Sequence, residues 1–259
     1  MFDRRRKPLG SLLRSLDDDG AIGIFCKATD ESFIEATAYS GLDFVIIDCE
    51  HGPVGRDVLK RNLMACRAGG VPGVVRTPGV DVNAIGAALD LGADGVQIPN
   101  ISSVKDAEKA VAAARFHPLG MRGVCRFVAA ADYGRKSRET YFASENEKLL
   151  ILQIEGAEGV AALDDILNIP GFDVIFIGPY DLSQAAGIPG EIDAREVQSM
   201  ITTIQRKAMA KKIQLGLFVD NVERARAARK AGFSYVACGV DVDIFRSACA
   251  QMMTSWRGE

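Results

Sequence analysis

Short apolar runs alternate with amphipathic stretches of helical length along most of the chain. Eight such runs occur, and each is too short for a capped helix, which predicts parallel strands that are buried on both faces. The runs are AIGIF (21–25), FVIIDCE (44–50), GVVRTP (73–78), GVQIPN (95–100), LLILQIE (149–155), DVIFIGP (173–179), LGLFVD (215–220) and YVACGVD (235–241).

Helical patterns lie between these runs, and several end in glycine, as helix C-termini prefer. Examples are 32–41, 82–92, 104–115 and 222–232. Strand and helix alternate about eight times, and an eightfold barrel typically has about 250 residues. The 259 residues therefore predict an α/β fold, a (β/α)₈ TIM barrel, as a single domain over 1–259. A doubly wound open sheet is the alternative, but no GxGxxG follows the first strand.

One stretch departs from this alternation. Residues 116–146 interrupt the fourth and fifth units with PLGMRGVCRF and then a polar segment. Loops of this length are often functional, so we expect a long loop insertion over the barrel mouth.

Composition and charge exclude several classes of protein. A content of 48% hydrophobic and 25% charged residues with a net charge of −3 predicts one soluble globular domain. The basic run from Arg4 to Lys7 is short, so we expect no nucleic-acid partner. The six cysteines form no CxxC pair, which argues against a zinc site or a disulfide scaffold. No signal-peptide pattern or long apolar run occurs, so we expect a cytoplasmic protein without a membrane partner.

Two acids follow apolar strand runs without a neighbouring cysteine or histidine. Glu155 closes the run at 149–155, and Asp181 comes shortly after the run at 173–179. On neighbouring strands their charges would repel unless a cation lay between them, and carboxylates with water suit Mg²⁺ or Mn²⁺. Either acid could instead cap the following helix or pair with an arginine.

Further polar residues stand at the ends of the predicted strands, where barrel enzymes place their active sites. They are Asp48, Glu50, His51, Arg76, Gln97, Asn100, Gln153 and Asp241. A 2-oxo acid such as pyruvate could chelate a cation here, and the cation would stabilise the enolate that forms. Arg76 would add a fixed positive charge. His51, one of two histidines, is the side-chain type suited to proton transfer near neutral pH.

Five blocks of the sequence together resemble the HpcH/HpaI aldolases. They are DCEHGP (48–53), GVVRTP (73–78), GVQIPN (95–100), LQIEG (152–156) and FIGPYDLS (176–183), and the resemblance extends from about residue 10 to 255. It implies a class II, divalent-metal-dependent pyruvate aldolase on a (β/α)₈ barrel. Such an enzyme reversibly cleaves a 4-hydroxy-2-oxo acid, dicarboxylic or sugar-derived, to pyruvate and an aldehyde through a metal-stabilised enolate.

The resemblance also implies roles for individual residues. Glu155 and Asp181 would hold the cation, which would be Mg²⁺, Mn²⁺ or Co²⁺. Arg76 would bind near the oxo acid, and His51, helped by Asp48, would transfer protons. The remaining matches are Gln153 beside the metal, Asp90 as an acid linked to the histidine network, and Gly178 and Pro179 in a loop whose backbone meets the substrate.

The same resemblance implies a homo-oligomer, as a hexamer or trimer of dimers, with the C-terminal helix exchanged between subunits. The apolar-rich end at 242–256 suits such an exchange, although it could equally be an ordinary last helix of a monomer. The chain departs from the family pattern at 115–127, so the aldehyde specificity is not carried over. His117, Cys125 and Arg126 lie in that stretch without an assigned role.

Three alternatives remain open at this point. A Schiff-base aldolase needs a lysine at a strand end, and Lys27 alone follows a strand. A lyase of related fold could act on a CoA-linked acid, as in the citrate lyase beta and malyl-CoA type. The barrel could also bind a metabolite without catalysis.

Overall fold

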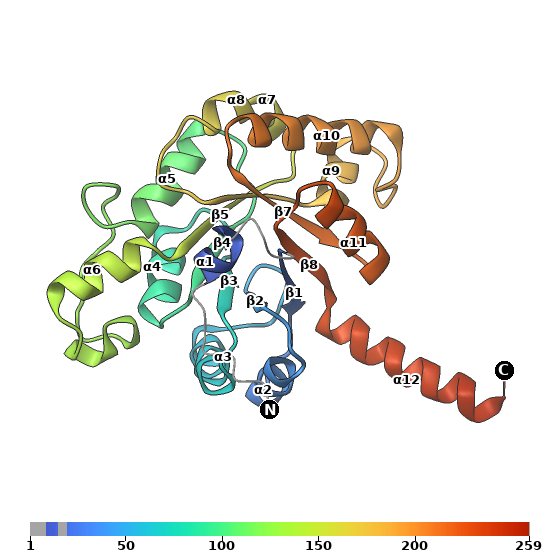
Figure 1. Ribbon diagram of the computed structural model, residues 1–259, viewed down its shortest axis with the longest axis horizontal. Coiled ribbons are helices and arrows are strands. Elements are labelled where there is room, and N and C mark those ends of the chain that lie inside the picture. The colour runs from blue at the N-terminus through green and yellow to red at the C-terminus, as the bar shows by residue number, and fades with distance from the viewer. Residues whose placement is uncertain (1–8, 15–19, 259) are drawn as a thin grey trace.

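Eight parallel strands close into a barrel in chain order (Figure 1). The computed structural model describes residues 9–14 and 20–258. All eight predicted runs form strands, which confirms the TIM barrel. The strands are β1 Ala21–Cys26, β2 Phe44–Asp48, β3 Gly73–Arg76, β4 Gly95–Ile98, β5 Leu149–Ile154, β6 Val174–Ile177, β7 Gln214–Val219 and β8 Tyr235–Val240. The basic run Arg4 to Lys7 lies outside the described residues.

Helices surround the barrel, and the four predicted examples are confirmed as α2, α4, α5 and α11. Each of these four begins after a residue whose side chain accepts a backbone N–H of the first turn, as N-cap residues do. The helices are α1 Leu9–Arg14, α2 Glu31–Tyr39, α3 Arg56–Gly69, α4 Val82–Asp90, α5 Val104–Ala114, the 3₁₀ helix η1 Ala129–Gly134, α6 Arg138–Asn146, α7 Ala157–Ala161, α8 Leu163–Ile166, α9 Pro179–Ala185, α10 Arg195–Ala210, α11 Val222–Lys230 and α12 Asp241–Arg257.

The strands are apolar on both faces because each face meets a different core. Alternate residues point into the barrel, where Phe44 stacks on Tyr235 with ring centroids 4.2 Å apart. Leu9 and Leu13 of α1 join this inner cluster. The other residues of each strand pack against the surrounding helices in a second, larger cluster. Because the period is two, polar residues at the strand ends are directed alternately into the barrel and toward the helices.

The stretch 116–146 is folded, and the expectation that it forms a loop over the barrel mouth is wrong. It contains η1 and α6, and it joins the end of α5 to the start of β5. A connection from a helix back to a strand returns to the N-terminal ends of the strands, opposite the mouth. The guanidinium of Arg115 anchors it there, donating to the carbonyl oxygen of Lys148 at 2.5 Å and to the carboxylate of Asp173 at 2.7 Å.

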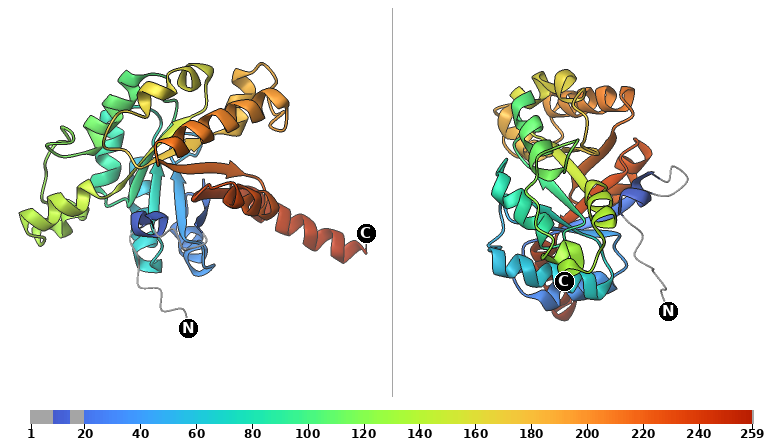
Figure 2. Two further views of the ribbon diagram at one scale, coloured as in Figure 1. Left: turned by 45° about the horizontal axis from the view of Figure 1, so that its top comes forward. Right: turned by 90° about the vertical axis from the view of Figure 1, so that its left-hand side faces the viewer.

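The last helix, α12, projects away from the barrel (Figure 2). Asp241, its first residue, is its one buried residue. Large apolar side chains along it are exposed, among them Phe245, Met252 and Trp256, the last of which is 84% exposed. The helix therefore carries apolar side chains that its own barrel does not cover. Within the described part of the chain, no helix has both the length and the apolar character that crossing a membrane requires.

Candidate active site

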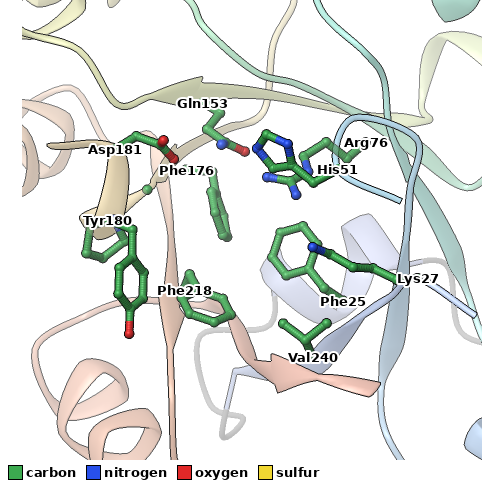
Figure 3. Close-up of a pocket in the computed structure, with 12 residues that line it drawn as sticks. Phe25, Lys27, His51, Arg76, Gln153, Phe176, Tyr180, Asp181, Phe218 and Val240 are labelled. Carbon is green, nitrogen blue, oxygen red and sulfur yellow. The ribbon is translucent and has the colours of Figure 1, made fainter. Parts of the chain in front are cut away.

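A cavity of about 230 Å³ opens among the C-terminal ends of the strands (Figure 3). Its volume equals that of about seven or eight water molecules, which suits a small metabolite. Six of the predicted site residues line it: His51, Arg76, Gln153, Gly178, Pro179 and Asp181. The remaining lining residues are Phe25, Lys27, Phe176, Tyr180, Phe218 and Val240. The structure thus brings together at one rim residues that are up to 130 positions apart in the sequence (51 to 181).

Arg76 is held in place by two acids and a ring. The register of β2 and β3 sets Asp48 beside Arg76. Nε of Arg76 donates to Oδ1 of Asp48 at 2.9 Å, and Nη2 donates to Oδ2 at 2.7 Å. Nη1 lies 3.2 Å from Oε2 of Glu50, and the Phe25 ring lies 4.5 Å from the guanidinium carbon. The guanidinium is therefore rigid, and two carboxylates balance its charge.

Asp48 also fixes the turn that carries His51. Its Oδ1 accepts the backbone N–H groups of Glu50 at 3.1 Å and His51 at 3.2 Å. Burial acts to raise the pKa of Asp48, but the hydrogen bonds and charge of Arg76, with these two N–H groups, hold that pKa below its ordinary value. The imidazole of His51 is 57% exposed, and its Nε2 lies 3.8 Å from Oε2 of Glu50. Asp48 thus contacts the backbone of His51, and Glu50 is the acid near its ring.

Glu155 lies directly behind the cavity wall and is 5% exposed. Its Oε2 accepts a hydrogen bond from Gln153, and its Oε1 accepts the backbone N–H of Asn100 at 2.7 Å. Asn100 has φ of 57°, a left-handed conformation that asparagine tolerates better than most residues. Its side chain donates to Glu50 at 3.0 Å. One polar network therefore connects Glu155 through Asn100 and Glu50 to Arg76.

Burial raises the pKa of Glu155 to about 7. The hydrogen bonds from Gln153 and from the backbone of Asn100 act in the opposite direction, while the charges of Asp181 and Glu50 raise the pKa further. The pKa of Glu50 is also raised, chiefly by burial and against the effect of Arg76. Asp181 is close enough to raise the pKa of both Glu155 and Glu50, and a bound cation would offset the mutual repulsion of the three acids.

The two predicted metal ligands, Glu155 and Asp181, both lie next to Gly178. A Cβ atom at that position would lie 2.8 Å from Oε2 of Glu155 and 3.5 Å from Oδ2 of Asp181, so both oxygens border the same small space. Asp181 is in the first turn of α9, which begins at Pro179. Among the described residues, no group of three or more histidine, cysteine, aspartate or glutamate side chains could hold a metal ion. Two carboxylates fit a hard cation that keeps its other positions for water and substrate oxygens, as Mg²⁺ does.

The structure does not bring Asp90 to this cavity within the chain. It is the last residue of α4, and Oδ1 accepts a hydrogen bond from Nη2 of Arg122 at 2.7 Å. Its link to the histidine network stays a prediction. Exposed His117 and Cys125 do not line the cavity either, and Arg126 donates to the carbonyl oxygen of Lys136.

Glu50 and Asn100, which complete the polar network, had no predicted role, and Lys27 was predicted only as a possible Schiff-base lysine. Nζ of Lys27 lies 3.8 Å from Oδ2 of Asp48, and its side chain lines the cavity. The available signal was the strand period of two, because Phe25 faces the barrel interior and Lys27 stands two positions later, directly after β1. The aromatic lining residues Tyr180 and Phe218 were also missed.

Added Mg²⁺ or Mn²⁺ should raise the melting temperature of the protein more at pH 8 than at pH 6. The folded pKa of Glu155 is raised, so without a cation stability falls as pH rises from the ordinary value of 4.5 through about 7. A cation reverses this loss, whereas below pH 7 it must first displace a proton. Thermal unfolding with metal and with chelator at both pH values measures the difference. Glu155→Gln should abolish it, and equal metal-induced shifts at both pH values would contradict the assignment.

Several known proteins resemble this chain over most of its length. The family model described as HpcH/HpaI aldolase/citrate lyase matches residues 21–248. A hydroxypyruvate/pyruvate aldolase of Paraburkholderia phytofirmans is 33% identical over 242 residues, which cover 91% of this chain and 92% of the relative. A 2-keto-3-deoxy-L-rhamnonate aldolase of Escherichia coli K12 is 34% identical over 238 residues, covering 91% and 88%.

Solved structures also resemble this chain over nearly its whole length. A crystal structure of an HpcH/HpaI aldolase/citrate lyase family protein from Burkholderia cenocepacia J2315 superposes with a TM-score of 0.91 and 30% identity, covering 96% of this chain and 98% of that chain. The citrate synthase SbnG superposes with a TM-score of 0.86 and 29% identity, covering 96% and 98%. The family model matches residues 21–248, and relatives of more than 30% identity cover nine-tenths of the chain. The chain therefore belongs to the HpcH/HpaI aldolase/citrate lyase family.

Proposed function

We propose that this protein is a divalent-metal-dependent aldolase that interconverts a 4-hydroxy-2-oxo acid with pyruvate and an aldehyde. The observation that carries the proposal is the pair of acids beside Gly178, next to a small cavity that a rigid arginine and a histidine also line. The similarity to a hydroxypyruvate/pyruvate aldolase and to a 2-keto-3-deoxy-L-rhamnonate aldolase supports carbon–carbon lyase chemistry.

Glu155 and Asp181 would hold the cation, with Gln153 beside them. A bound divalent cation supplies Lewis-acid stabilisation of the negative charge that develops on the oxo acid. Oxygen ligands suit Mg²⁺ or Mn²⁺, with Co²⁺ as a further candidate. The backbone at Gly178 and Pro179 forms the wall next to these acids and would meet the substrate there.

Arg76 supplies a donor whose orientation is set before the substrate arrives. Its hydrogen bonds to Asp48 and its ion pair with Glu50 prevent the guanidinium from turning away. A fixed positive group of this kind stabilises a developing oxyanion without having to reorganise during the reaction.

His51 would transfer the protons. In the cleavage direction its imidazole takes the proton of the 4-hydroxyl group while the bond between C3 and C4 breaks and the aldehyde leaves. The imidazolium of His51 then gives a proton to C3 of the pyruvate enolate, which returns His51 to its starting state. Because the imidazole is more than half exposed, it can exchange its proton with solvent between these steps.

Proton NMR of pyruvate in D₂O tests the proposal without knowledge of the aldehyde. Metal-stripped protein should exchange the methyl protons only after Mg²⁺ or Mn²⁺ is added. Exchange that persists without metal would instead indicate a Schiff base at Lys27, the lysine that lines the cavity. No exchange under either condition would contradict the proposal and favour a CoA-ester lyase or a binding protein.

His51→Ala should slow methyl exchange by about 100-fold, the usual contribution of a general base. The metal-dependent rise in melting temperature should be retained, because the proposed metal ligands are Glu155 and Asp181 and not His51. His117→Ala is the matched control, since that histidine is exposed and lies outside the cavity. An unchanged rate in His51→Ala across the pH range would assign the base to another group.

A homo-oligomer is part of the proposal, as a hexamer or trimer of dimers. The uncovered apolar side chains of α12, including Phe245 and Trp256, would pack against a neighbouring copy. Burying side chains of this size supplies most of the free energy of a typical subunit interface. Light scattering coupled to gel filtration measures the mass, and a monomer at micromolar concentration would contradict this part of the proposal.

A further inference from the structure

A buried glutamine, Gln97, lies on the inner face of β4, deeper in the barrel than the cavity. Val96 and Ile98 on either side of it pack against the surrounding helices, so the strand period of two directs Gln97 into the barrel. Its side chain is 0% exposed and does not line the cavity, so it cannot touch a substrate. Its register partner on β5, Ile151, is apolar and belongs to the inner cluster. Packing alone does not explain an amide at this depth, because burying one costs free energy unless its polar atoms are paired.

A directed chain of hydrogen bonds connects Gln97 to Glu155. Nε2 of Gln97 donates to Oε1 of Gln153 at 2.5 Å, and Nε2 of Gln153 donates to Oε2 of Glu155. Strands in a closed barrel are tilted, which lets the side chain of Gln97 reach a residue two positions nearer the mouth than its register partner Ile151. Gln153 and Glu155 are 1% and 5% exposed, so bulk water competes little for these hydrogen bonds.

This chain sets the direction in which the amide of Gln153 faces. The two ends of a glutamine amide have nearly the same shape, but its NH₂ group only donates and its oxygen only accepts. With Oε1 paired to the donor of Gln97, the NH₂ group of Gln153 faces Glu155. A reversed amide would place its oxygen against a carboxylate oxygen of Glu155, and neither atom could donate. The donor of Gln97 and the charge of Glu155 therefore favour the same orientation.

The other end of the Gln97 amide is unpaired. Its Oε1 is buried, and within the described part of the chain no group donates a hydrogen bond to it. An unpaired buried acceptor makes a folded protein less stable than an apolar side chain of similar size would. Gln97 thus lowers stability at one end and supplies a donor to Gln153 at the other, which indicates a role in the site and not in the fold.

We propose that Gln97 is a positioning residue of the metal site, which holds the NH₂ group of Gln153 toward Glu155 and thereby fixes the orientation of that carboxylate. This inference rests on the proposed metal-dependent function and deepens it. The other oxygen of Glu155 accepts the backbone N–H of Asn100 at 2.7 Å, so each oxygen has a donor of fixed position. A carboxylate oriented before the cation arrives loses little conformational freedom on binding it, and residues that orient metal ligands in this way raise metal affinity.

Calorimetric titration with Mn²⁺, without substrate, tests this inference. Gln97→Met removes the donor and keeps the length of the side chain, so it should weaken Mn²⁺ binding by about 10-fold, the lower end of the usual effect of losing a residue that orients a metal ligand. Gln97→Asn is shorter by one methylene group and should give a similar loss, so the result does not depend on how methionine packs. Gln205→Met is the control, because Gln205 donates to the carbonyl oxygen of Ala231 and does not line the cavity.

A double variant distinguishes positioning from a general effect on the fold. Gln153→Met alone should weaken Mn²⁺ binding by about 10- to 100-fold. If Gln97 acts through Gln153, adding Gln97→Met to that variant should cause no further loss. Losses that multiply in the double variant would overturn the inference, and so would a Gln97→Met protein that binds Mn²⁺ as tightly as the unmodified protein or more tightly.

Methyl exchange of pyruvate in D₂O, measured on the same samples, separates the inference from the proposed function. Metal-dependent exchange with unchanged Mn²⁺ affinity in Gln97→Met would remove the inference and leave the aldolase function intact. Absence of exchange in the unmodified protein would contradict the aldolase function, and absence of Mn²⁺ binding would remove the inference with it.

Discussion

Glu155→Gln should lower the rates of pyruvate methyl exchange and of aldol cleavage by about 1,000-fold or more at ordinary metal concentrations. A bound cation contributes several kcal/mol of transition-state stabilisation, and each ~1.4 kcal/mol corresponds to about a factor of ten in rate. Glutamine has the same shape as glutamate, and its carbonyl oxygen can still accept the N–H of Asn100. The variant therefore removes one negative charge from the pair at Gly178 with little change in packing. Steady-state kinetics measures the loss of rate, and calorimetric titration with Mn²⁺ measures the loss of metal binding.

Glu145→Gln provides a matched control for this experiment. Glu145 is as deeply buried as Glu155, and burial also raises its pKa, but it pairs with Arg122 away from the cavity. Its replacement should leave Mn²⁺ binding and methyl exchange intact. Full activity of chelator-treated Glu155→Gln would remove the cation from the mechanism.

Arg76→Lys should lower kcat/KM by about 100- to 1,000-fold, the usual effect of losing one fixed donor to a developing oxyanion. Lysine keeps the charge but cannot donate two parallel hydrogen bonds to Asp48 and also reach Glu50. Arg76→Met should in addition destabilise the fold by about 3–5 kcal/mol, because it leaves the buried Asp48 carboxylate without its partner. Kinetics with saturating metal and urea unfolding measure these losses separately.

The double variant Asp48→Asn with Arg76→Met distinguishes catalysis from stability. It should recover part of the lost stability, because the buried carboxylate of Asp48 is no longer left without Arg76, although Glu50 still loses its ion pair. It should recover none of the activity. Arg115→Lys is the control, because Arg115 is also a buried arginine that pairs with an acid, Asp173, and it does not line the cavity. A rate for Arg76→Lys close to that of the unmodified protein would contradict the assigned role.

The candidate site was predictable from sequence where position along a strand was sufficient. Arg76 and Gln153 stand at the ends of apolar runs, and Asp181 follows one closely. The barrel architecture brings the C-terminal ends of all its strands to one rim, so the gathering of these residues followed from the fold class. The fold class did not determine which hydrogen-bond partners each of these side chains has. Asp48 was expected to assist His51, whereas its carboxylate accepts hydrogen bonds from the side chain of Arg76 and only from the backbone of His51.

Hydrogen bonds between residues on different strands depend on strand register and on the direction of each side chain. The local sequence pattern carries no information about either. Asn100 reaches Glu155, 55 residues later, because its left-handed backbone turns its N–H group back toward β5. Asp241 reaches Lys27 over 214 residues because β1 and β8 are neighbours in the closed barrel. Neither contact has a signature in the residues that surround it.

Periodicity, N-caps and the five family blocks are short-range or contiguous features, so the eight strands, the main helices and the family could be predicted from the amino-acid sequence alone. Three features required the three-dimensional arrangement: 116–146 lies at the end opposite the mouth, Asp90 pairs with Arg122, and the side chain of Lys27 lines the cavity. These outcomes depend on which strands are adjacent and on how distant side chains compete for the same partner. Such competition is settled by packing in three dimensions.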